Sequence, residues 1–132
     1  MKSLLILLFL SAFSTHMDAQ SLRVKRKYYK TYEGEMPTYN VLLGTEIVEI
    51  PTCKIALSLT KDSVFFQLGQ LKFNNSFQLE KTGSPDEICI IVLRENSDIP
   101  ERFILNTKEK SILRKGISPQ PDVKLTKVKK SR

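Results

Sequence analysis

The chain has 132 residues, and its 21 Lys and Arg against 14 Asp and Glu give a formal net charge of +7. This length fits one small domain. The only histidine is His16, so removal of the first residues would leave a mature protein without histidine and would exclude histidine-dependent catalysis. The charge is uneven: residues 27–116 hold 12 basic and 12 acidic side chains, whereas residues 117–132 hold five and one. The central domain therefore has no net attraction for polyanions.

The first residues have the layout of a secretory signal peptide. Lys2 precedes an apolar run from Leu4 to Phe13, and small and polar residues follow. The run of about ten residues is roughly half the length that a membrane span requires. We predict a signal peptide over residues 1–14, or over residues 1–19 if cleavage follows Ala19, and a secreted, extracellular protein.

The next segment contains a candidate processing site. Arg23-Val24-Lys25-Arg26 matches the R-x-K-R pattern of furin-type convertases, whose acidic pockets accept several basic side chains. Residues 15–26 would form a short pro-segment, and the processing residues would be Arg23, Lys25 and Arg26. The alternative is a solvated basic strand that is never cut, because cleavage needs an exposed, flexible loop.

Three tyrosines follow this site, interspersed with two lysines. Tyr28, Tyr29 and Tyr32 have two interpretations. They either belong to a first strand whose alternate tyrosines pack on the domain, or they grip a receptor or a sulfated glycan, since tyrosine is an efficient interface residue.

Alternating apolar side chains predict β-strands through the middle of the chain. Residues 53–60 place Cys53, Ile55, Leu57 and Leu59 on one face, and Val64, Phe66 and Leu68 form the next inward row. The parity changes at Gly69, which indicates a bulge or a bend. Beyond it, Leu71, Phe73, Phe77 and Leu79 lie on odd positions, on either side of a predicted hairpin tip at 73–77. Further strands are predicted at 88–93, 103–105 and 112–113, and short apolar runs flank Gly44.

The connections between these strands are too short for crossover helices. We therefore predict an all-β domain over residues 27–116, either a small antiparallel β-sandwich or a partly open barrel. Cys53 and Cys89 are the two cysteines, and in an oxidising compartment they predict one intrachain disulfide. Two free buried thiols or an intermolecular bridge are the alternatives.

Two further features concern the surface. Asn74-Asn75-Ser76 is a glycosylation sequon, and we place Asn74 at a hairpin tip, where a turn-forming Asn pair is the alternative. From Ile117 onward, prolines and lysines predict a flexible basic tail over residues 117–132, able to contact sulfated glycans or anionic lipid. The alternation of apolar and polar residues in the tail leaves an edge strand as the alternative. The candidate contact lysines are Lys124, Lys127, Lys129 and Lys130.

The sequence carries no recognisable catalytic constellation. Its glycines are scattered rather than clustered in a phosphate loop, and no zinc or calcium motif is present, so we expect no cofactor and no metal site. The closest carboxylate pairs are Glu46 with Glu49 and Asp86 with Glu87, whose ordinary role is surface solvation. A carboxylate-dependent hydrolase is therefore the weakest of the alternatives.

These features together predict a secreted, proteolytically matured, non-enzymatic binding protein that acts as an extracellular mediator or effector. Its partners would be an extracellular protein or receptor, a processing convertase, and a sulfated glycan or anionic surface at the tail. The compartment argues against nucleic acid. The first alternative is an extracellular matrix, mineral or membrane-surface protein that uses its cationic tail, including polyanion-binding or antimicrobial roles.

Overall fold

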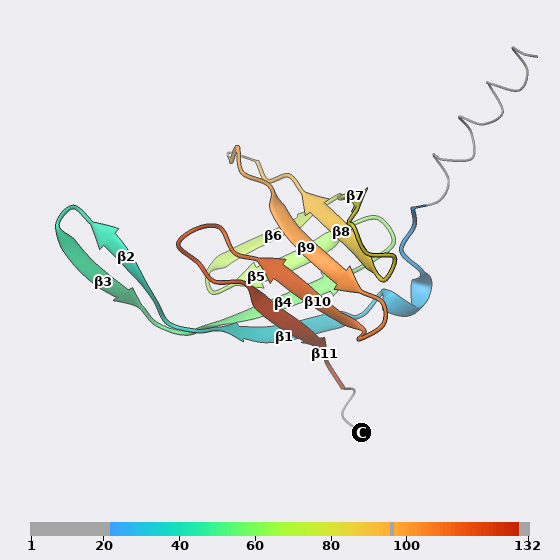
Figure 1. Ribbon diagram of the computed structural model, residues 1–132, viewed down its shortest axis with the longest axis horizontal. Coiled ribbons are helices and arrows are strands. Elements are labelled where there is room, and N and C mark those ends of the chain that lie inside the picture. Colours follow the sequence, from blue (N-terminus) through green and yellow to red (C-terminus); the bar gives the residue numbers. More distant parts are fainter. Residues whose placement is uncertain (1–21, 96, 130–132) are drawn as a thin grey trace, which may run out of the picture.

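The computed structural model describes residues 22–95 and 97–129, and it shows an all-β chain built on one curled antiparallel sheet (Figure 1). The predicted signal peptide, the pro-segment before Leu22 and Lys130 lie outside the described residues. No helix in the described ranges is long and apolar enough to cross a membrane. The elements are η1 (Arg26–Tyr28), β1 (Thr31–Met36), β2 (Tyr39–Leu43), β3 (Glu46–Ile50), β4 (Cys53–Leu59), β5 (Val64–Leu68), β6 (Leu71–Asn75), β7 (Gln78–Lys81), β8 (Glu87–Val92), β9 (Glu101–Asn106), β10 (Ser111–Lys115) and β11 (Val123–Lys127).

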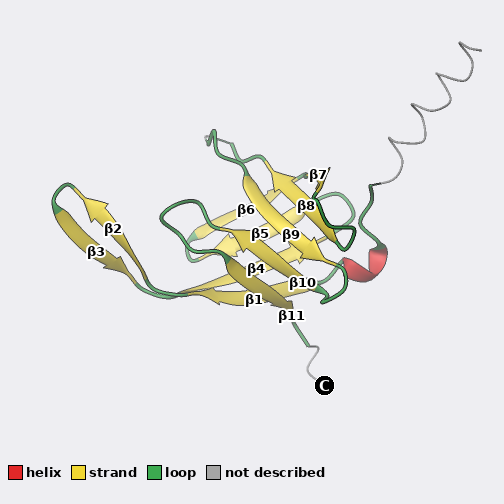
Figure 2. Cartoon of the chain, in the orientation of Figure 1, coloured by secondary structure: helices red, strands yellow, loops and turns green. Residues whose placement is uncertain are grey.

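Nine strands form the main sheet in the order β6-β5-β4-β1-β11-β10-β9-β8-β7, and β2 and β3 form a separate two-stranded sheet. All pairings are antiparallel, and the main sheet curls into a half-barrel (Figure 2). Of the two predicted architectures, the structure therefore has the partly open barrel.

The concave face of the sheet holds the core. Strand alternation works as predicted in β4, where Ile55, Leu57 and Leu59 are buried, and in β5, where Val64 and Phe66 are buried. The opposite wall supplies inward side chains from β8, β9, β10 and β11. These are Ile90, Val92, Phe103, Leu105, Ile112, Val123 and Leu125.

The segment around Asn74 differs from the prediction of a hairpin tip. The turn that joins β5 to β6 is at Gly69, whose φ of +58° suits a glycine, so the parity change there is a hairpin turn. β6 and β7 follow each other in the chain but form opposite edges of the sheet. The Asn75 side-chain amide donates to the Leu93 carbonyl at 2.9 Å, and Asn74 is exposed within β6. The predicted tip is therefore a crossing between the two edges.

The predicted disulfide is wrong, because Cys53 and Cys89 are both free thiols. Cys53 has the inward parity of Ile55 and packs against the core. Cys89 has the opposite parity to the buried Ile90, so it lies on the convex face of the sheet. Four strands separate β4 from β8 in the sheet order. The cysteine count alone could not reveal that the two side chains point to opposite faces.

The predicted flexible tail is also wrong for the residues that the structure describes. β11 lies inside the sheet between β1 and β10, with Ile112 opposite Leu125 and Tyr32 opposite Lys127. Val123 and Leu125 are buried, while the lysines between and after them face solvent. The lysine-rich composition suggested a solvated terminus, but the apolar alternation decides the structure, since it gives the strand a buried face.

A long hairpin leaves the half-barrel at β1 and β4. The pairing of Met36 with Cys53 in the main sheet continues in the same register as Tyr39 with Ile50 in β2 and β3. Pro37 and Pro51 lie in the gap between the two parts, where the ladder is interrupted because proline has no amide N–H to donate. We call Tyr39–Ile50 the arm, and it extends away from the half-barrel in Figure 1.

Candidate functional site

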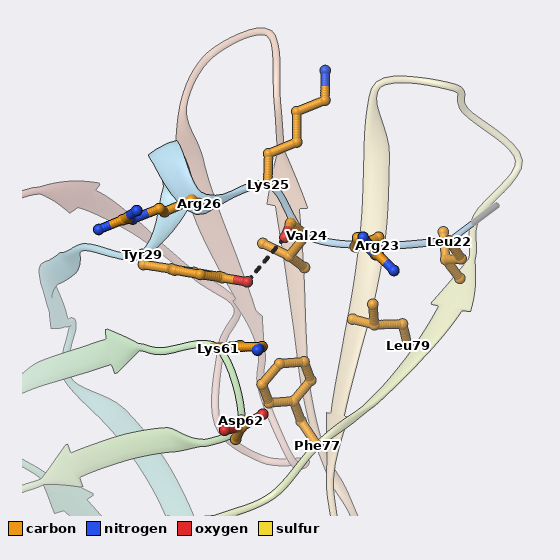
Figure 3. A pocket seen from close by; sticks show the side chains of 10 residues that line it. All are labelled: Leu22, Arg23, Val24, Lys25, Arg26, Tyr29, Lys61, Asp62, Phe77 and Leu79. Carbon is orange, nitrogen blue, oxygen red and sulfur yellow. Dashed lines mark hydrogen bonds between the residues drawn. The ribbon is translucent and has the colours of Figure 1, made fainter. Parts of the chain in front are cut away.

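The predicted processing segment lies across one end of the half-barrel, beside a pocket of about 770 Å³. Figure 3 shows Val24 between the exposed side chains of Arg23 and Lys25 and directed toward the protein interior. Val24 is only 4% exposed, and its carbonyl accepts a hydrogen bond from the Tyr29 hydroxyl at 3.2 Å. The pocket is lined by Leu22, Arg23, Val24, Lys25, Arg26, Tyr29, Lys61, Asp62, Phe77 and Leu79.

The peptide bond after Arg26 lies within a hydrogen-bonded turn. Arg26 begins the single 3₁₀ turn η1, and the amides of Tyr28 and Tyr29 donate to the carbonyls of Lys25 and Arg26, both at 3.0 Å. A protease that binds its substrate in an extended conformation must first open this turn and withdraw Val24. The side chains of Arg23, Lys25 and Arg26 are exposed, whereas the backbone of the segment is held by hydrogen bonds and by the buried Val24.

The tyrosines connect this segment to the sheet. Tyr28 and Tyr32 are buried; the Tyr32 hydroxyl donates to the Tyr28 carbonyl at 2.9 Å, and the Tyr28 hydroxyl donates to the Thr107 carbonyl at 3.3 Å. Burial, with a smaller contribution from Tyr28, raises the pKa of Tyr32 to about 12, so its hydroxyl stays neutral at physiological pH. These two side chains fix η1 on the end of the half-barrel.

Four lysines gather beside these tyrosines. A pocket of about 230 Å³ is lined by Lys27, Tyr28, Lys30, Tyr32, Lys110 and Lys127. We call it the lysine pocket. Its lysines come from the N-terminal segment, from the turn between β9 and β10, and from β11. The fold thus joins two regions that the sequence marked separately, the tyrosine segment and the lysine-rich end of the chain.

The other predicted contact lysines lie elsewhere. Lys124 forms an ion pair with Glu109 at 2.9 Å, which holds the pKa of the Glu109 carboxyl below its usual value through a hydrogen bond and the nearby charge. Lys129 is exposed beyond the end of β11. Of the proposed tail lysines that the structure describes, Lys127 alone lines the lysine pocket.

The arm carries the three most exposed large apolar side chains of the described residues. Leu42 is 67% exposed, Leu43 61% and Ile47 73%. Leu42 and Ile47 are direct cross-strand partners, so they form one apolar pair near the tip. The arm contains two acidic residues, Glu46 and Glu49, and no basic residue. These two glutamates are three positions apart in β3 and therefore point to opposite faces.

A buried ion pair joins Glu101 in β9 to Arg114 in β10, close to Tyr39 at the base of the arm. Arg114 is 1% exposed and Glu101 is fully buried; the guanidinium donates from Nε and Nη2 to the two carboxylate oxygens, each at 3.1 Å. Arg114 also donates to Gln120 at 2.8 Å, and Arg94 approaches Glu101 at 3.7 Å. This network was not predicted from the sequence. Its signal was parity, because Glu101 aligns with the inward Phe103 and Arg114 with the inward Ile112.

Comparison with models of protein families, with curated proteins and with solved structures finds no match for this chain. The arm, the processing segment and the lysine pocket are therefore the candidate functional sites of this chain.

Proposed function

We propose that this chain is a secreted, proteolytically matured, non-enzymatic binding protein that acts outside the cell through its arm. The observation that carries the proposal is the arm itself, because its tip presents Leu42, Leu43 and Ile47 to solvent. Exposed apolar side chains on a projecting element are costly to keep in water and are typical of a contact surface.

The arm also indicates the chemistry of its partner. Its two glutamates are not balanced by any basic side chain within residues 39–50. A complementary protein surface would offer an apolar groove for Leu42 and Ile47, with basic residues at its rim. We therefore propose an extracellular protein of this kind, such as a receptor, as the partner.

A double substitution in the arm tests this proposal. Changing Leu42→Ser and Ile47→Ser is expected to weaken saturable binding to the surface of responsive cells by about tenfold or more, since central apolar contacts carry much of an interface's binding free energy. The measurement is flow cytometry with labelled protein, with and without protease treatment of the cells.

The matched control is Leu93→Ser with Ile99→Ser, because these side chains are also exposed, at 60% and 54%, but lie outside the arm. This control is expected to bind as the unchanged protein does. Equal loss of binding in both double variants, or binding that survives protease treatment of the cells, would contradict an arm-mediated protein contact.

A substitution of the buried Val24 tests the proposed cleavage after Arg26. A serine at this position keeps the basic residues Arg23, Lys25 and Arg26 and removes an apolar side chain from the core. Cleavage of a locally opened site follows the population of the open form, and a buried valine stabilises the closed form by about 1.5 kcal/mol or more. Val24→Ser is therefore expected to speed convertase cleavage after Arg26 about tenfold, measured by the intact mass of the product.

The control for cleavage is Val128→Ser, since Val128 is 41% exposed and lies far along the chain. It is expected to be cut at the original rate, and Arg26→Ala is expected not to be cut. A Val24→Ser protein cut no faster than the unchanged chain would show that docking of Val24 does not limit processing. Resistance of every variant to the convertase would remove the proposed maturation.

A further inference from the structure

We propose that the lysine pocket binds the sulfate groups of an acidic extracellular polysaccharide. The site is separate from the arm, and the polymer would be a second partner. The choice of an extracellular polysaccharide rests on the proposed secretion, whereas the binding itself can be measured on the purified protein.

The lysine pocket concentrates positive charge. Among the residues that the structure describes, the lining holds Lys27, Lys30, Lys110 and Lys127 and no acidic residue. None of these four forms an ion pair within the described ranges, although Lys115 and Lys124 are paired with Asp122 and Glu109. Four like charges around one small cavity repel one another, and a bound anion would relieve this repulsion.

The backbone of Lys110 has an unusual conformation at the rim of the pocket. Its φ is +58°, in the left-handed region that glycine or asparagine adopts at lower cost than lysine. The turn around it is fixed, because the Asn106 side-chain oxygen accepts from the amides of Lys108 and Glu109, and the Asn106 carbonyl accepts from Lys110. An unfavourable conformation thus holds a lysine, rather than a glycine, at the rim of the pocket.

Two buried tyrosines form a fixed part of the wall of the lysine pocket. Tyr28 and Tyr32 are buried and tied together by the hydrogen bond between the Tyr32 hydroxyl and the Tyr28 carbonyl. The Lys27 ammonium lies 5.2 Å from the centre of the Tyr28 ring, so a cation–π contact helps to place this lysine. The rim lysines therefore surround a preformed hollow.

A second basic pocket borders the same turn, which favours a polymer with several sulfate groups over a single anion. Arg26 lines the larger pocket and Lys27 lines the lysine pocket, so both pockets lie against η1. The larger pocket adds Arg23, Lys25, Arg26 and Lys61 against one acid, Asp62. Cleavage after Arg26 would remove three of these basic residues and the hydrogen bond from the Tyr28 amide to the Lys25 carbonyl. It would keep all the residues that line the lysine pocket and add the new α-ammonium group of Lys27. The sulfate site should therefore persist after maturation.

The test is binding of a heparin-derived decasaccharide to the full secreted protein, measured by calorimetry at physiological ionic strength. Lys110→Gln with Lys127→Gln is expected to weaken binding about tenfold or more, since each basic residue near an anionic surface contributes about 1 kcal/mol. The matched control is Lys72→Gln with Lys81→Gln, which removes the same charge from β6 and β7 and is expected to change the affinity less than about twofold. All four residues are exposed, so folding should be unaffected.

Two further measurements identify the ligand and the site. Desulfated heparin and vesicles of phosphatidylserine with phosphatidylcholine are expected to bind at least about tenfold more weakly than the sulfated decasaccharide, given the charge that they present. The decasaccharide is expected to protect Lys110 and Lys127 from acetylation, read by mass spectrometry. Equal loss of affinity in the control, equal binding of desulfated heparin, or preference for the vesicles would overturn the proposal.

Discussion

Replacing Glu101 with alanine is expected to lower the free energy of unfolding by about 3–5 kcal/mol, because it leaves the buried Arg114 guanidinium without its counter-charge. Glu101 receives two hydrogen bonds from Arg114 at 3.1 Å, and Arg94 lies within 3.7 Å of the same carboxylate. One buried carboxylate therefore lies close to two guanidinium groups, that of the buried Arg114 and that of the partly exposed Arg94. The measurement is urea unfolding followed by far-ultraviolet circular dichroism.

Two controls separate charge burial from simple loss of a side chain. Glu109→Ala removes a carboxylate of the same type that pairs with Lys124 at the surface, and it is expected to have far less effect, since solvent screens exposed pairs. The double change Glu101→Leu with Arg114→Met is expected to recover part of the lost stability, because it removes the buried charges together. A Glu101→Ala protein as stable as the Glu109→Ala protein would contradict this account of the ion pair.

The buried ion pair is a part of the fold that the sequence pattern did not predict. Period-2 alternation correctly predicted the inward rows of β4 and β5, because the apolar positions there are uninterrupted. In β9 and β10 a charged residue occupies an inward position on each strand. Composition assigns such residues to the surface, and only the pairing of β9 with β10 shows that the two charges meet.

The connectivity was harder to predict than the strands. The segment Phe73–Phe77 has the residues of a tight turn, yet β6 pairs with β5 and β7 pairs with β8 at the far edge. This arrangement depends on how the whole sheet curls, which no local pattern encodes. The same limit explains the disulfide, since a pairing requires knowledge of which face each cysteine occupies.

Only some residues of the candidate sites could be predicted from the sequence. Tyr28, Tyr32 and Lys127 were singled out from composition alone, in two unrelated segments of the sequence. Their neighbour Lys110 was not, because nothing local distinguishes it from other exposed lysines. It joins the lysine pocket through the turn between β9 and β10 and through the position of β11 beside β1. The arm was visible only as two short apolar runs around Gly44, and their exposure became evident from the fold.

Ending the chain at Gly116 is expected to abolish folding, although composition marks the removed residues as a basic tail. The truncation deletes β11, so β1 and β10 lose the strand that lies between them, and the core loses Val123 and Leu125. Each of these two buried side chains contributes about 1.5–3 kcal/mol, and two ladders of backbone hydrogen bonds are lost in addition. Together these losses reach the total stability of a typical small domain, about 5–15 kcal/mol.

The matched truncation ends the chain after Lys129, which removes the last three residues and keeps all the described strands. It is expected to unfold cooperatively at the same denaturant concentration as the full chain, while the protein ending at Gly116 shows no cooperative transition. Circular dichroism and urea unfolding of the three proteins provide the comparison. A cooperative, native-like transition in the protein ending at Gly116 would mean that β11 is dispensable, and Lys127 would then belong to a detachable tail. In that case the lysine pocket would lose one of its walls, so the position of β11 underlies both the fold and the proposed polysaccharide site.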